Sequence, residues 1–146
     1  ISASRVVRLF GFDPKVAFVS HSTFGQPLTS RTKHIKNAVE ILKKKNVNFE
    51  FDGDMQPDVA LDKEYQSLYP FSKIVGNANI LIMPGQHSAA ISYKMMKTLG
   101  DTKVIGPLLI GLGLPIEIAP LRSSTSEILN LASIAAYSAD VIEYSK

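Results

Sequence analysis

Short apolar runs alternate with helix-like patterns along the whole chain. Three runs, at residues 15–20, 47–51 and 79–83, are bounded by proline, glycine or polar residues, which is typical of buried strands. Two shorter runs, at residues 103–105 and 115–118, have the same character. Between the runs lie segments that predict helices. The alternation predicts the α/β class, here a three-layer α/β/α sandwich around a mainly parallel sheet.

The expected helices carry recognisable end signals. They lie around residues 35–42, 61–69, 88–99 and 124–139. The first has apolar residues three and four apart, the spacing of one helix face, and ends in Lys43–Lys45, where cations are favourable. Gly100 follows the third helix as its expected cap. Ser124–Glu127 has the sequence of a capping box and should open the last helix.

Composition narrows the classes of function. The 146 residues, 45% of them hydrophobic and 20% charged, suffice for one domain with a real core. The net charge of +3 is mild and scattered, so we expect no nucleic-acid partner. The chain has no cysteine and no run of about 20 apolar residues. We therefore expect a cytoplasmic protein with no membrane partner. A start at Ile1 rather than methionine predicts a piece of a longer protein.

Three carboxylates, Asp52, Asp54 and Asp58, crowd between an expected strand and an expected helix start. In open α/β sheets, ligands bind beyond the carboxyl ends of the strands. Asp54 and Asp58 are expected either to hold loops through backbone N–H groups or to perform acid–base work, and the first is the leading interpretation.

Four loops follow expected strands and should converge on one edge of the sheet: residues 20–25, the acidic block, residues 84–88 and the glycine-rich run from Gly106. Glycine turns and helix N-termini suit phosphate groups. Ser22 and Thr23 are expected either to contact phosphate or only to stabilise their turn.

The histidines and the paired glycines have plainer interpretations. His21 and His87 are expected to bond to backbone groups, with a functional role as the alternative, and His34 only to be solvated. Gly111 and Gly113 do not form a dinucleotide fingerprint, because Ile116 stands where the third glycine belongs.

Four blocks of sequence resemble one known family. Residues 15–25 resemble its K-V-A-x-L-S-x-S-T-x-G pattern, and residues 52–61 its D-G-D-x-Q-x-D-x-A-L pattern. Residues 76–84 and 105–115 resemble G-x-A-N-V-L-I-x-P and I-G-P-x-x-x-G-x-x-x-P. The family is that of the phosphate acetyl/butyryltransferases. The chain most resembles the transferase-like C-terminal domain of bacterial NADP-dependent malic enzymes.

The resemblance implies an isocitrate/isopropylmalate dehydrogenase-like fold. Residues 1–120 would be the second domain of a phosphotransacetylase-like module, and residues 121–146 a terminal helix returning to a first domain outside this chain. NADP and a divalent metal would belong to malic-enzyme domains further upstream. The protein would form a homo-oligomer.

One block departs from the family pattern. Active acetyltransferases carry a serine, an arginine and a later aspartate where this chain has Pro120, Leu121 and Glu127. Proline and leucine supply neither a hydrogen-bond donor nor a positive charge for the developing charge of acyl transfer. The resemblance therefore implies a pocket that binds acetyl-CoA as an effector and catalyses nothing, with no catalytic residue, cofactor or metal of its own.

Two alternatives stay open at this point. The first is a working phosphate acetyltransferase that uses Arg122 from a shifted loop, and the second is a purely structural domain. The residues that the resemblance implies in binding acetyl-CoA or phosphate are Ser22, Thr23, Asp54, Gln56, Gly85, Gln86, His87, Gly106, Pro107, Gly111, Arg122 and Ser124.

Overall fold

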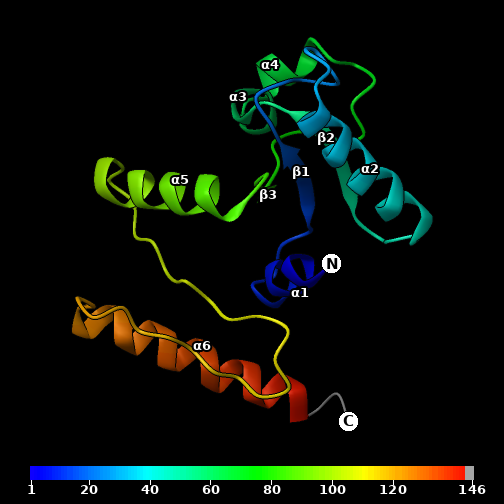
Figure 1. Ribbon diagram of the computed structural model, residues 1–146. Helices are drawn as coiled ribbons and strands as arrows, with labels where there is room; N and C mark the ends of the chain where they lie inside the picture. Colours follow the sequence, from blue (N-terminus) through cyan, green and yellow to red (C-terminus); the bar gives the residue numbers. More distant parts are fainter. Residues whose placement is uncertain (144–146) are drawn as a thin grey trace. The chain divides into compact units, whose positions relative to one another are not determined.

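The structure is a computed structural model that describes residues 1–143 (Figure 1). Its elements, in chain order, are α1 (Ser2–Leu9), β1 (Lys15–Val19), α2 (Ser30–Lys44), β2 (Glu50–Met55), α3 (Pro57–Leu61), α4 (Lys63–Ser67), β3 (Ile80–Ile82), α5 (Gln86–Leu99) and α6 (Thr125–Glu143). The chain forms two compact units, one of residues 1 and 3–94 and one of residues 2 and 95–146. We describe each unit by itself.

The first unit contains a parallel sheet with the strand order β2-β1-β3. Val16, on the central strand, lies opposite Phe51 on β2 and Ile80 on β3. Neighbouring side chains of a strand point to opposite faces, and both Val16 and Ala17 are buried. Both faces of the sheet are therefore covered at β1, as parallel sheets require. The predicted α/β class with a parallel sheet is confirmed.

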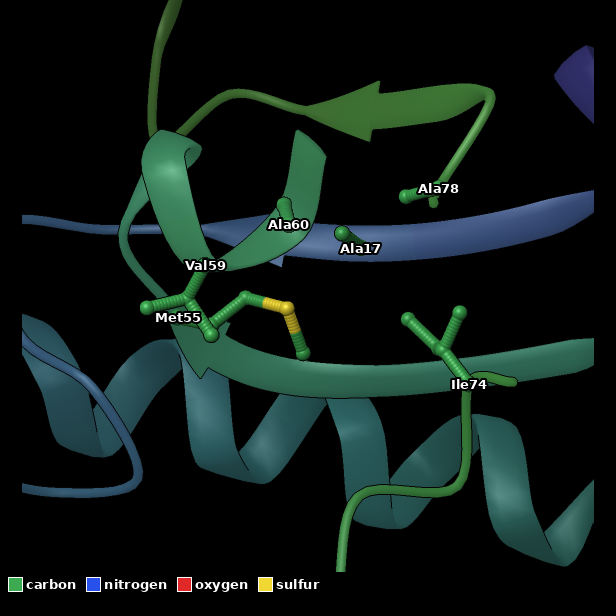
Figure 2. Packing of buried hydrophobic residues seen from close by; sticks show 6 residues of the cluster. All are labelled: Ala17, Met55, Val59, Ala60, Ile74 and Ala78. Atoms are coloured by element: carbon green, nitrogen blue, oxygen red, sulfur yellow. The ribbon is translucent and has the colours of Figure 1, made fainter. Parts of the chain in front are cut away.

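The hydrophobic core lies between the sheet and the short helix α3 (Figure 2). Its buried members are Ala17, Met55, Val59, Ala60, Ile74 and Ala78. Ala17 and Ala60 are fully buried, and their small side chains let α3 approach β1 closely. α2 packs against β2 and buries Val39 and Leu42. Each large apolar side chain buried in this way contributes about 1.5–3 kcal/mol.

The start of α2 is fixed by a capping box. Thr29 Oγ1 accepts a hydrogen bond from Thr32 N at 3.3 Å, and Thr32 Oγ1 accepts one from Thr29 N at 2.8 Å. The helix ends at Lys44, inside the predicted lysine run. It begins before the apolar stripe, because its N-cap, Thr29, lies six residues ahead of Ile35.

Two predicted elements are displaced. The second strand was expected at residues 47–51, but β2 runs from Glu50 to Met55, so Asp52 and Asp54 lie inside the strand. The helix expected at residues 61–69 is instead two short helices, α3 and α4. Pro57 starts α3, and Asp62 Oδ1 caps α4 by accepting from Glu64 N at 2.8 Å. The helix α1 was not predicted.

The second unit contains α6 and the extended segments before it. The strands expected at residues 103–105 and 115–118 are wrong, because residues 95–143 contain no strand. A strand needs a hydrogen-bonded neighbour, which an apolar run cannot reveal. α6 lies in the predicted terminal segment 121–146, whose last three residues fall outside the described part of the chain. No helix within residues 1–143 has the length and apolarity to cross a membrane.

Candidate functional site

Asp54 holds the loop that follows β1. The residue is 3% exposed, and its Oδ2 accepts a hydrogen bond from Ser22 Oγ while its Oδ1 accepts one from Gly25 N at 3.1 Å. Its backbone oxygen also accepts from Phe24 N at 2.6 Å. Both carboxylate oxygens therefore have protein partners, which fits the loop-holding interpretation of this residue.

The same loop is also joined to the end of β2 by hydrogen bonds that backbone N–H groups donate. Ser20 N donates to Met55 O at 2.9 Å, and Gln56 N donates to Thr23 Oγ1 at 3.2 Å. Ser22 and Thr23 are buried. Their hydroxyls are thus engaged within the protein, which fits the alternative that they stabilise the turn.

The other two carboxylates of the acidic block also accept backbone N–H groups. Asp52 accepts from Gly53 N at 3.0 Å and from Lys73 N at 2.8 Å, which ties residues 72–74 to β2. Asp58 accepts from Val59 N at 2.9 Å. For Asp52, which is buried within β2, these hydrogen bonds offset the cost of placing a carboxylate in the strand.

A cleft of about 610 Å³ opens beside this loop, within the size range of small-molecule sites. We call it the histidine cleft; its lining residues are Ser20, His21, Arg31, His34, Ile35, Pro84, Gly85, Gln86, His87 and Ser88. They come from the loop after β1, from α2, and from the turn before α5 together with the first turn of α5. The predicted convergence of the loops after the first and third strands is thus observed.

The charges of the histidine cleft favour an anion. Arg31 and the three histidines line it, and no lining residue is a carboxylate. No ion pair within residues 1–143 involves any of these four side chains. The first turn of α5 also lies in the lining, and helix N-termini attract negative charge. In the described residues, no group of three or more His, Asp or Glu side chains is arranged to hold a metal ion.

Sequence reasoning did not single out Arg31, which lines the cleft. His34 is exposed, as expected, and it also lines the cleft. They are three residues apart on α2 and so share a face of the helix. That spacing was visible in the sequence, but which side of α2 faces the end of β1 was not.

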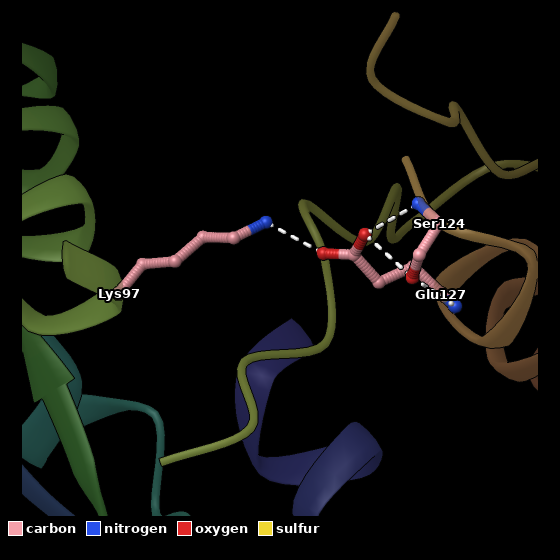
Figure 3. A network of polar contacts seen from close by, with 3 residues as sticks. All are labelled: Lys97, Ser124 and Glu127. Atoms are coloured by element: carbon pink, nitrogen blue, oxygen red, sulfur yellow. Dashed lines mark hydrogen bonds and ion pairs between the residues drawn. The ribbon is translucent and has the colours of Figure 1, made fainter. Parts of the chain in front are cut away.

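Glu127 is held by a network in the second unit (Figure 3). Lys97 Nζ donates to Glu127 Oε1 at 2.6 Å, and the backbone N and hydroxyl of Ser124 donate to Oε2 at 2.7 and 3.0 Å. Glu127 N in turn donates to Ser124 Oγ at 3.3 Å, so the predicted capping box is confirmed. The hydrogen bond from Lys97, followed by those from Ser124, lowers the pKa of Glu127 to about 2.

The remaining predicted site residues also lie in the second unit: Gly106, Pro107, Gly111, Arg122 and Ser124. The hydroxyl of Ser124 donates to Glu127 in the cap of α6. Arg122 and Leu121 are exposed. The predicted site residues of the first unit and those of the second unit were expected to form one pocket, and this stays a prediction.

A small cavity of about 10 Å³ lies among residues 104–106, Pro120, Ser123 and the start of α6. This volume holds about one water molecule. Ser123 Oγ is buried without a partner in the described residues and could bond to such a water.

Comparisons with known proteins give the family. The chain is 45% identical over 137 residues to the NADP-dependent malic enzyme of Rhizobium meliloti, covering 94% of this chain and 18% of that protein. It is 36% identical to the phosphate acetyltransferase of Clostridium acetobutylicum, covering 91% of this chain and 40% of that protein. The chain thus spans less than half the length of these relatives.

A solved structure and a family model agree with these relatives. A phosphotransacetylase from Streptococcus pyogenes superposes with a TM-score of 0.88 at 33% identity, over 94% of this chain and 42% of that one. The model of the phosphate acetyl/butaryl transferases matches residues 1–136. The chain belongs to the phosphate acetyl/butaryl transferase family.

Proposed function

We propose that this chain is the C-terminal regulatory domain of an NADP-dependent malic enzyme. It binds acetyl-CoA, or a related acyl-CoA, and does not itself transfer acyl groups. Other domains of the same protein bind NADP and a divalent metal and convert malate to pyruvate by oxidative decarboxylation. The domain also helps to hold a homo-oligomer together in the cytoplasm.

The observation that supports the absence of acyl transfer is the hydrogen bonding of the Glu127 carboxylate. This residue occupies the position of the family's aspartate, and it is bonded to Lys97 and Ser124. Both of its carboxylate oxygens accept hydrogen bonds from these partners, so the side chain is committed to the cap of α6 rather than to a substrate. Pro120 and Leu121, in place of the serine and arginine, support the same conclusion.

The observation that supports binding is the histidine cleft. Acyl-CoA carries several phosphate groups, and a cleft lined by Arg31, histidines and a helix N-terminus suits such anions. The relative named as a malic enzyme supports the assignment to that class of protein.

The second candidate is an active phosphate acetyltransferase, forming acetyl phosphate and CoA from acetyl-CoA and phosphate. The exposed Arg122 and the 36% identity to a protein of that name favour it. A purely structural domain is the third candidate, and detectable acetyl-CoA binding would exclude it.

One assay separates the first two candidates. The complete natural protein is incubated with acetyl-CoA and phosphate, with the phosphate acetyltransferase of Clostridium acetobutylicum as the positive control. We expect no acetyl phosphate above background. Turnover that is lost in Arg122→Gln would establish the transferase instead. Malate oxidation is measured in parallel with and without acetyl-CoA, and we expect acetyl-CoA to change its rate.

A further inference from the structure

The histidine cleft gathers every histidine of the chain. His21 follows β1, His34 lies on α2, and His87 lies in the first turn of α5, so three separate elements contribute one each. All three side chains are exposed to solvent. Histidine is the side chain that ordinarily gains or loses charge at about pH 5–8.

The other charged groups around the cleft have a fixed sign. Arg31 is the one arginine of the lining, and the lining contains neither lysine nor a carboxylate. A carboxylate does reach the neighbouring loop, since Asp54 bonds to Ser22, but it is buried and both its oxygens are occupied. Protonation of the histidines therefore adds positive charge to a cleft that has no negative side chain in its lining.

We propose that the histidine cleft is a proton-linked anion site, which binds a phosphate-bearing ligand more tightly as the pH falls from about 8 to about 6. An anion favours the charged form of a nearby histidine, and the charged histidine favours the anion to the same extent. Arg31 supplies the attraction that does not depend on pH. This inference rests on the proposed function, because it makes the phosphates of acyl-CoA the ligand.

The first test uses sulfate, which keeps its full charge across this pH range, on the complete natural protein. Calorimetric titration at pH 6 and pH 8 should show affinity at least about fivefold higher at pH 6, the effect of one added charge roughly 4 Å from the anion. Titration in two buffers of different ionisation heat should show net proton uptake. Equal affinity at both values, no proton uptake, or no sulfate binding at all would overturn the proposal.

Four variants assign the roles. His34→Gln should reduce proton uptake and the difference in affinity between pH 6 and pH 8, with little effect at pH 8. Arg31→Gln should weaken binding about equally at both values. Lys36→Gln, two residues from His34 and outside the lining, is the matched control and should behave as the unaltered protein. A pH dependence that is unchanged in His34→Gln and in His21→Gln would contradict the assignment.

Acetyl-CoA is then titrated under the same conditions. If acetyl-CoA binds with equal affinity at pH 6 and pH 8, and sulfate binding does not depend on pH either, the proposed function stands and the proton linkage is contradicted. Acetyl-CoA that binds at neither value overturns the proposed function, while the sulfate titration still decides the chemistry of the cleft.

Discussion

At the scale of single residues, Asp54 is the clearest case of a carboxylate committed to structure. It joins the end of β2 to the loop after β1 through Ser22 Oγ, Gly25 N and Phe24 N. Without the carboxylate, Gly25 N would lose its acceptor, and Ser22 Oγ would keep only its 3.3 Å contact with Ser20 Oγ. Such a loss costs more than the bond itself contributes.

Asp54→Ala should therefore loosen this loop by about 2–4 kcal/mol, since a buried donor without an acceptor costs roughly 1–3 kcal/mol. The measurement is hydrogen exchange of peptides covering residues 20–26 in the complete protein, where exchange should accelerate. Asp58→Ala is the control, because Asp58 is exposed and its carboxylate accepts a hydrogen bond from the adjacent Val59 N. Equal effects of the two substitutions would contradict the role of Asp54.

Gly53 is required by space and by backbone conformation. Its φ is +145°, and an added Cβ would lie 2.6 Å from Phe18 O and 2.8 Å from Phe18 Cβ. Gly53→Ala should therefore force β2 away from β1 and destabilise the first unit by more than about 3 kcal/mol.

Two measurements show the effect of Gly53→Ala: hydrogen exchange of the backbone amides of residues 15–19 and 50–55, and the melting temperature of the protein. Gly113→Ala is the matched control, since nothing lies within 4 Å of the Cβ that it would add. A melting temperature that Gly53→Ala leaves unchanged would show that β2 can move without cost.

At the scale of elements, the start of α6 depends on an ionised carboxylate. The folded pKa of Glu127 is lowered from 4.5 to about 2 by Lys97 and Ser124. A lowered pKa means stability that is present above the ordinary value and lost as the pH falls through the folded value. The cap of α6 should thus weaken between about pH 4.5 and pH 2.

Glu127→Gln should remove this pH dependence, because the amide does not titrate. Protection of residues 124–130 from hydrogen exchange is compared in the two proteins at matched pH. The unaltered protein should be better protected at pH 6, and the difference should shrink as the pH falls below about 4. A difference that is constant across this range would show that the charge of Glu127 does not stabilise the helix.

At the scale of the whole molecule, the proposed regulation requires reciprocal coupling between two sites. If acetyl-CoA weakens malate binding by some factor, malate must weaken acetyl-CoA binding by the same factor. Such factors are typically about 5–150. Titrating each ligand in the presence and absence of the other, without NADP turnover, should give equal ratios of Kd. A ratio of one for both ligands would show that the two sites are not coupled.

Much of the first unit followed from local sequence. The strands at residues 15–20 and 79–83 were predicted because apolar runs flanked by proline and glycine have few other stable arrangements. The capping box of Ser124 and Glu127 was predicted because its bonds join residues three apart. The resemblance of four short blocks indicated the family that the comparisons then established.

Other features depended on contacts between distant residues. The bounds of β2 were misplaced because its acidic residues look unlike a strand. Hydrogen bonds from Gly25 N, Ser22 Oγ and Lys73 N stabilise these carboxylates there. Arg31 and His34 joined the cleft through the packing of α2 against β2, which buries Val39 and Leu42. The sequence by itself determined the class of fold, the family and the cap of α6, because these depend on neighbouring residues. Only the tertiary structure decided which carboxylates accept hydrogen bonds from distant donors and which basic side chains line the cleft, because both depend on residues brought together from tens of positions apart.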